Sequence, residues 1–154
     1  MKTSLIVSLI VSVLVGIFLI SQGYQLRRDV ESVAHRAQVA ADVPDMLEYM
    51  RELKSGMERH GMTRGHTALI FTTPANDLAR LNESIASIIT RLEAVKDIPR
   101  TETTYQVALD DIRGTIRELE EPSMGFLFVR YWFLFLAGFG IWIWPIVIFV
   151  RNEY

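Results

Sequence analysis

Methionine and histidine are concentrated in one short stretch of the chain, and both residue types can bind a metal. Met57, His60, Met62 and His66 lie within this stretch. Thioether and imidazole groups together suit Cu(I), so the sequence allows a copper site that needs no cysteine. The chain contains no cysteine, which excludes thiolate zinc sites, iron–sulfur clusters and disulfides.

The same methionines also have a structural interpretation. Met46, Met50 and Met57 recur with helical spacing, which places them on one face of an amphipathic helix, where methionine commonly fills a hydrophobic core. We favour this interpretation, with His60 and His66 at the surface. Copper is the alternative, and no other cofactor is expected.

The remaining titratable residues form no catalytic pattern. Asp110 and Asp111 are adjacent, as are Glu120 and Glu121, and adjacent side chains point about 100° apart on a helix, which spoils them as an acid–base pair. His35 is a single histidine among charged neighbours. No P-loop, G-x-S-x-G, H-E-x-x-H or dinucleotide-binding motif occurs. We therefore expect that this chain is not an enzyme.

Charge and hydrophobicity are separated along the 154 residues. Residues 25–125 hold 13 of the 16 basic residues and 17 of the 18 acidic residues, so this stretch has a formal charge of −4. A mildly acidic stretch offers no basic surface for a phosphate backbone, and we exclude nucleic acid as a partner. Half of the chain is hydrophobic, and most of this excess lies towards the two ends.

The first uncharged segment is long enough to cross a bilayer. Leu5–Ile20 is almost entirely apolar and continues to Tyr24 without a charge, and a helix of about 20 residues spans about 30 Å of hydrocarbon. A cleaved signal peptide is the alternative, but Ser21-Gln22-Gly23 is a poor cleavage site. We expect an uncleaved membrane anchor.

The second uncharged segment is Tyr131–Val150. Arg130 and Arg151 flank it, and its tryptophans lie towards its ends, as is typical of membrane interfaces. Pro145 lacks a backbone N–H and predicts a bend in the last turns, which a neighbouring polar group can compensate.

Small residues recur every fourth position in the first segment, at Ser4, Ser8, Ser12 and Gly16. Such residues share one face of a helix, and small residues allow two membrane helices to approach closely. We predict that this face packs against another helix. That helix belongs either to the second segment, which contains the small residues Ala137, Gly138 and Gly140, or to another subunit.

Four amphipathic stretches with helical periodicity lie between the two segments. The first should continue directly out of the membrane. The second should begin at Asp42-Val43-Pro44, and the third at Thr73-Pro74, with the threonine as cap. The third should end near Lys96. The fourth should begin around Thr101–Thr103 and stop before Pro122.

The apolar faces of these stretches predict the core of the domain. They are Leu26, Val30, Val33, Ala34, Ala37 and Ala41; Met46, Met50, Leu53 and Met57; Leu78, Leu81, Ile85, Ile88, Ile89 and Leu92; and Tyr105, Leu109, Ile112, Ile116 and Leu119. Residues 66–71 are ambiguous, because so short a run either extends the second helix through a kink or forms a connector at the end of the domain.

These observations predict an all-α membrane protein, in which two transmembrane helices bracket an antiparallel four-helix aqueous bundle. The expected divisions are residues 1–24, 25–123 and 124–154. Two opposed spans place both termini on one side of the membrane. Lys2 favours a cytoplasmic start and Arg27 and Arg28 oppose it, but long loops are translocated largely regardless of charge. We expect the cytoplasmic (inner) membrane, with residues 25–123 extracytoplasmic.

The layout of a span, a helical domain and a second span resembles the input domains of bacterial chemoreceptors and sensor kinases. That resemblance implies a sensor-like protein that binds a small ligand and signals laterally to a membrane partner. The tail after the second span is only Arg151 to Tyr154, which offers no output module. We therefore favour a non-catalytic accessory subunit that docks on other integral membrane proteins through its spans, within the lipid bilayer. Homo-oligomers are compatible with the same sequence.

Overall fold

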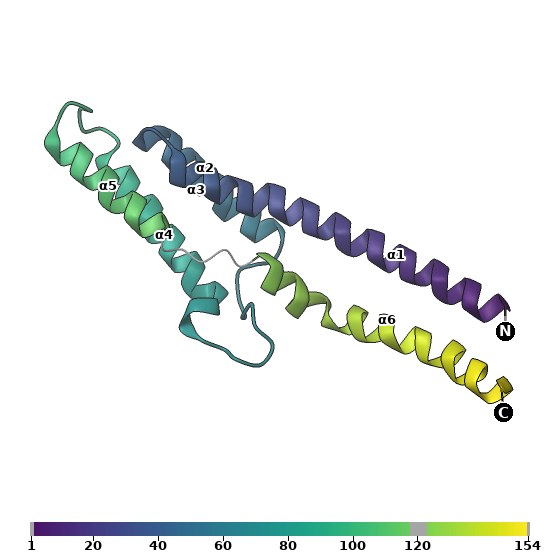
Figure 1. The fold of residues 1–154 in the computed structure, drawn as a ribbon. Coiled ribbons are helices and arrows are strands. Elements are labelled where there is room, and N and C mark those ends of the chain that lie inside the picture. Colours follow the sequence, from purple (N-terminus) through teal and green to yellow (C-terminus); the bar gives the residue numbers. More distant parts are fainter. Residues whose placement is uncertain (1, 118–122, 154) are drawn as a thin grey trace.

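The computed structural model describes residues 2–117 and 123–153, and the regular structure in these ranges is helical (Figure 1). The elements are α1 (Lys2–Leu26), the π-helical turn η1 (Arg27–Glu31), α2 (Ser32–Val39), α3 (Val43–Arg59), the 3-10 turn η2 (Pro74–Asn76), α4 (Leu78–Val95), α5 (Thr103–Arg117) and α6 (Ser123–Glu153). The chain is thus all-α over its described residues, as the sequence predicts.

The first predicted span and the first amphipathic stretch form one continuous rod of α1, η1 and α2 (Figure 1). The division expected after residue 24 therefore falls inside a helix. The apolar stripe along this rod is buried at Leu26, Val30, Val33 and Ala37. At the end of the rod, however, Ala40 is buried and Ala41 is exposed, because the helix has ended at Val39 and the backbone has turned.

The start of α3 agrees with the sequence signal. The Asp42 side chain caps the helix by accepting a hydrogen bond from the Asp45 N–H at 3.0 Å. The Tyr105 hydroxyl of α5 accepts a hydrogen bond from the buried Val43 N–H at 2.9 Å. Arg113, also on α5, donates to the Ala40 carbonyl at 2.7 Å. The turn between α2 and α3 is thus held by α5, through backbone groups that the helices leave unpaired.

The third predicted helix begins later than Thr73-Pro74. Thr73 caps the short turn η2 instead, and its N–H donates to the Asn76 side chain at 3.0 Å. Asp77 is the cap of α4 and accepts from the Ala79 N–H at 2.9 Å. The chain offers two capping sequences in succession, and the second begins the long helix.

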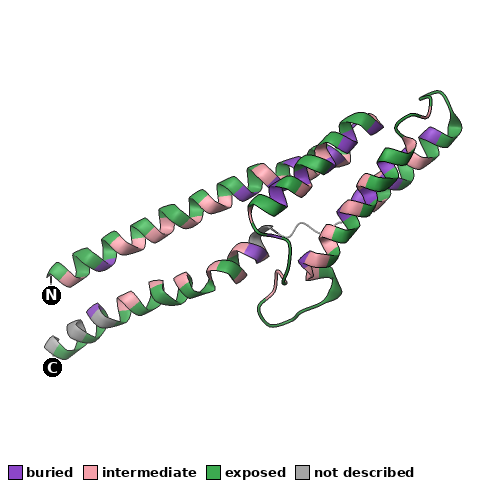
Figure 2. Cartoon of the chain, turned by 180° about the vertical axis from the view of Figure 1, so that it is seen from behind, coloured by how far each residue is buried: buried purple, intermediate pink, exposed green. Residues whose placement is uncertain are grey.

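The predicted apolar faces of the second, third and fourth stretches face the interior (Figure 2). Leu81 and Ile89 are partly buried at the edge of the core, and Leu119 lies outside the described residues. Helix α3 packs against α2 and α4, while α5 packs against α4 and α2, and the chain reverses direction at each connection (Figure 1). Residues 66–71 form a loop outside the helices, so the connector alternative is correct and the extended-helix alternative is wrong.

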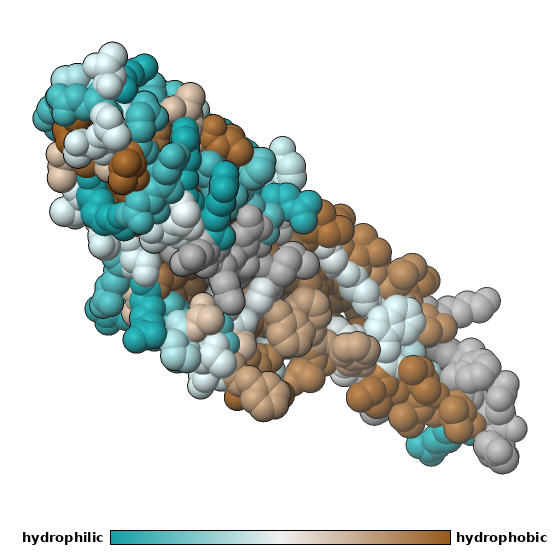
Figure 3. Space-filling model, turned by 60° about the vertical axis from the view of Figure 1, so that its left-hand side comes forward, coloured by the Kyte–Doolittle hydropathy of each residue, from teal (hydrophilic) through white to brown (hydrophobic). Residues whose placement is uncertain are grey.

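Helices α1 and α6 run side by side away from the domain, and their outer ends lie together (Figure 1). Both are long and apolar enough to cross a membrane. Hydrophobic side chains gather over this pair, while hydrophilic ones cover much of the domain (Figure 3).

The sequence predicts a bend at Pro145, but α6 departs from helical geometry at Tyr131 instead, where φ is −113° and ψ is 17°. Proline at position 145 leaves the carbonyl four residues earlier, that of Ile141, without its helical donor. The Ser8 hydroxyl of α1 donates to this Ile141 carbonyl at 3.3 Å. A neighbouring helix thus satisfies the group that the proline leaves unpaired.

Candidate functional site

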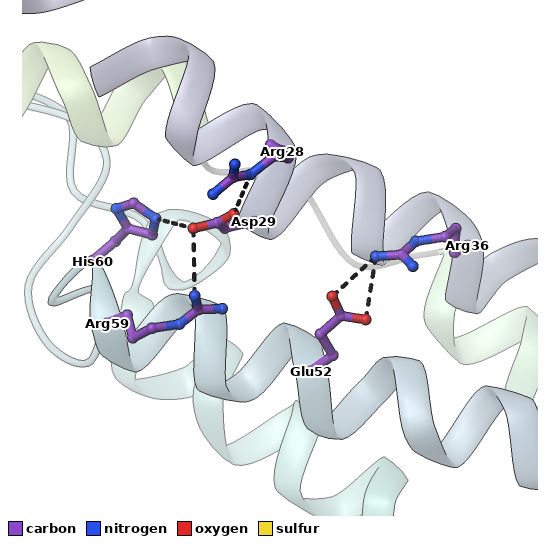
Figure 4. Close-up of polar contacts among 6 residues, drawn as sticks. All are labelled: Arg28, Asp29, Arg36, Glu52, Arg59 and His60. Atoms are coloured by element: carbon purple, nitrogen blue, oxygen red, sulfur yellow. Dashed lines mark hydrogen bonds and ion pairs between the residues drawn. The ribbon is translucent and has the colours of Figure 1, made fainter. Parts of the chain in front are cut away.

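Charged side chains converge where the two apolar helices join the domain, around Asp29 (Figure 4). Arg28 donates to one Asp29 oxygen at 2.9 Å. The other oxygen lies 3.1 Å from His60 Nε2 and 3.6 Å from Arg59 Nη1. Arg28 and Asp29 belong to η1, Arg59 is the last residue of α3, and His60 is the C-cap of α3. The cluster therefore ties the first rod to α3.

The backbone around Asp29 is itself unusual. Residues 27–31 form a π-helical turn, in which the Ser32 N–H donates to the Arg27 carbonyl five residues back. Gly56 of α3 packs against this turn so closely that a Cβ at position 56 would lie 2.3 Å from the Asp29 carbonyl oxygen. Glycine at this position therefore permits the close approach that places His60 and Arg59 beside the Asp29 carboxylate.

These partners change the acidity of Asp29. The Arg28 hydrogen bond is the largest influence holding the pKa of the Asp29 carboxyl below its ordinary value of 3.8, and the His60 hydrogen bond acts in the same direction against the opposing effect of burial. Asp29 in turn raises the pKa of Arg28. The carboxylate therefore stays charged under ordinary conditions and fixes the positions of its cationic neighbours.

Arg130, from α6, completes the junction. Its guanidinium donates to the His60 carbonyl at 3.2 Å and lies over the Phe126 ring. Gly61, with φ +72°, turns the chain directly after His60, and a Cβ there would lie 2.9 Å from Arg130 Nη1. The glycine both adopts the left-handed conformation and leaves room for the guanidinium.

A pocket of about 370 Å³, including its open mouth, lies between these elements. Its polar lining consists of Gln22, Arg59, His60, Arg130 and Tyr131, and its apolar lining consists of Leu26, Phe126 and Leu127. The Tyr131 hydroxyl donates to the side-chain amide oxygen Oε1 of Gln22 at 3.3 Å. The pocket thus has a cationic and polar part next to an apolar wall, where α1 and α6 leave the domain.

The predicted copper ligands lie in different environments. Met57 and Met62 are buried in the hydrophobic core, while the His60 ring faces Asp29 and His66 forms an isolated backbone bridge with Asp77. Among the described residues, no three histidine, aspartate or glutamate side chains are grouped to hold a metal ion. A site built on thioether ligands stays a prediction, and the core explains the methionines in full.

Two members of the small-residue face contact the second apolar helix. Ser8 donates to Ile141, as described above, and Ser12 Oγ accepts from the Trp142 indole N–H at 2.9 Å. Ser4 is partly buried. A Cβ at Gly16 would meet no atom within 4 Å, and the same holds for Gly138 and Gly140. Ser8 and Ser12 therefore make polar contacts with α6, and the glycines leave open space within this chain.

The sequence did not predict that Asp29, Arg59 and Arg130 lie in one cluster. Arg27 and Arg130 each border an uncharged stretch, and Arg28 follows Arg27, so their common depth was readable from the sequence. The contacts of Asp29 and Arg130 with His60 were not, because they depend on how α3 returns along the first rod.

Comparison of the chain with protein-family models, curated proteins and solved structures finds no match.

Proposed function

We propose that this chain is a two-pass protein of the cytoplasmic (inner) membrane and a non-catalytic accessory subunit of a larger membrane complex. In this proposal α1 and α6 dock laterally on other integral membrane proteins. The helical domain, arranged as an antiparallel four-helix bundle, braces or caps the partner outside the cytoplasm, and both termini are cytoplasmic.

The observation that carries the proposal is the exposed apolar surface of α1 and α6. In each, 6% of the most apolar stretch is buried within this chain. Phe139, for example, is 76% exposed. Apolar surface on this scale requires lipid or other helices to cover it. The contacts between α1 and α6 occupy one face of each helix and leave the others available to a partner.

A second exposed apolar feature supports the membrane location. Ile70 and Phe71, in the loop before η2, are 81% and 80% exposed. The loop lies beside the start of α6, at the end of the domain from which the spans emerge (Figure 1). Gly125 of α6 approaches the loop so closely that a Cβ there would lie 2.5 Å from the Thr67 carbonyl oxygen. A bilayer around the spans would bring lipid to this loop.

Site-specific photocrosslinking in native membranes tests the proposal. A photoreactive residue at Phe139 faces away from the chain, whereas one at Ser12 faces α6 and serves as the matched control. We expect position 139 to give a defined adduct with a different integral membrane protein, and position 12 to give crosslinks within the chain. Adducts at position 139 with lipid alone, or with a second copy alone, would contradict the accessory-subunit function.

A sensor-like function is the second candidate, and the pocket at the junction favours it. The pocket places cationic and polar side chains beside an apolar wall, which is the combination of groups that orients a small ligand in a binding site. In this alternative, a ligand between the spans and α3 would alter their packing and so bias a membrane partner. Crosslinking at Phe139 that changes with ligand occupancy would distinguish this function from passive bracing.

A further inference from the structure

We infer that the pocket between α1, α3 and α6 binds an anionic phosphate group. This group belongs either to the headgroup of an anionic phospholipid or to free phosphate. The lipid source rests on the proposed membrane location, whereas the anion site itself rests on the residues around the pocket.

The charge of the pocket is the first argument. Arg59 and Arg130 both line it. Arg59 lies 3.6 Å from Asp29, whose oxygens already bond Arg28 and His60 at 2.9 and 3.1 Å. One carboxylate thus serves three partners, and among the described residues no carboxylate lies within ion-pair distance of Arg130. The pocket therefore keeps an excess of positive charge.

The kind of donor is the second argument. A guanidinium presents several N–H groups in a plane, which match the oxygens of a phosphate and form charge-assisted hydrogen bonds. Arg130 Nη1 is positioned by the His60 carbonyl at 3.2 Å, which leaves its other N–H groups for a ligand. Tyr131 donates to the side-chain oxygen Oε1 of Gln22, so the side-chain NH2 group of Gln22 also remains as a donor in the lining.

The apolar wall is the third argument. Leu26, Phe126 and Leu127 line the same pocket, and the exposed apolar faces of the spans continue from it. A site for a small free anion needs no such wall, whereas a phospholipid carries hydrocarbon chains next to its charged head. The lining residues belong to the end of α3 and to the parts of α1 and α6 next to the domain. If α1 and α6 cross a bilayer, these residues lie at the depth of the headgroups.

A titration of the detergent-solubilised full-length chain tests the inference. The probes are dioctanoyl phosphatidylglycerol, dioctanoyl phosphatidylcholine and inorganic phosphate, and the measurements are thermal unfolding and native mass spectrometry. The test variant is the double substitution Arg59→Gln, Arg130→Gln. Arg151→Gln is the matched control, because it removes an exposed arginine from the other end of α6.

We expect phosphatidylglycerol to bind with defined stoichiometry, and the double variant to bind it at least about tenfold more weakly, as the loss of charge-assisted hydrogen bonds implies. The control should stay within about twofold of the original chain. A chain with Arg59→Gln and Arg130→Lys keeps the charge at position 130. If the double glutamine variant is folded but binds weakly, this chain should recover part of the affinity for phosphatidylglycerol. Inorganic phosphate that binds as well as the lipid, and with the same dependence on the two arginines, identifies the free anion as the source.

Equal binding of phosphatidylcholine and phosphatidylglycerol would overturn the inference, as would undiminished binding by a folded double variant. The titration uses the chain without any partner, so its result is independent of the crosslinks formed at Phe139. If position 139 crosslinks to another membrane protein but the chain binds no anion, the anion site alone is refuted. If the chain binds the anion but position 139 gives no such crosslink, the accessory-subunit function alone is refuted.

Discussion

Substitution of Gly56 by alanine tests the close packing between η1 and α3. The added Cβ would lie 2.3 Å from the Asp29 carbonyl oxygen and 3.2 Å from its carbonyl carbon. Because both neighbours are backbone atoms, no side chain can rotate away, and the two helices must separate by about 1 Å to restore ordinary contact. Overpacking of this kind costs about 1–3 kcal/mol. Alanine regains up to about 1 kcal/mol of helix propensity, and separation also weakens the contacts of Asp29 with His60 and Arg59.

We therefore expect Gly56→Ala to lower the free energy of unfolding by about 1–2 kcal/mol, which corresponds to a fall in Tm of about 2–8 °C for a chain of this size. The assay is thermal unfolding of the full-length chain in detergent, followed by circular dichroism. Gly114→Ala is the matched control, because a Cβ there meets nothing within 4 Å and the residue also lies within a helix. The control should be neutral or stabilising. A Gly56→Ala chain as stable as this control would refute the packing argument.

Three further predictions follow from individual contacts. Asp29 has a lowered pKa, so its contribution to stability is full above its ordinary pKa and is lost as the pH falls through its folded pKa. The stability difference between the chain and Asp29→Asn should therefore shrink as the pH falls below 3.8, the ordinary pKa of this carboxyl. Ser8→Ala should cost about 0.6–1.7 kcal/mol in detergent, because it leaves the Ile141 carbonyl unpaired. Phe71→Cys, the sole cysteine of such a variant, should react slowly with a water-soluble maleimide in lipid vesicles and rapidly in detergent.

Each of these predictions has its own control. Asp45→Asn removes a carboxylate at the start of α3 instead of the one at the junction, and should not reproduce the acid dependence of Asp29→Asn. Pro145→Leu restores the helical donor to Ile141, so Ser8→Ala should cost less in that background. Val107→Cys, on α5, replaces another exposed apolar residue and should react equally fast in vesicles and detergent. Equal reaction rates at positions 71 and 107 in vesicles would contradict contact between the loop and lipid.

Several local features of the fold were predictable from short stretches of sequence. The Asp42 cap, the stripe containing Met46, Met50 and Met57, and the helical start at Thr103 depend on interactions within one or two helical turns. The start of α4 was misplaced because Thr73-Pro74 and Asp77 are both competent caps. Propensity within four residues does not decide between them, whereas the packing of Leu78 into the core does.

The sequence by itself determined that the chain forms helices, that two of them are apolar enough to cross a membrane, and which faces of the others are buried. Periodicity and uncharged length are local properties, and they need no knowledge of the partner surface. The tertiary structure alone decided that Asp29, His60, Arg59 and Arg130 meet, and that Ser8 satisfies the carbonyl left free by Pro145. These residues are far apart in the chain. Their contacts depend on the angle and depth at which α3 and α6 return to the first rod. The close packing of Gly56 against η1 sets the approach of α3.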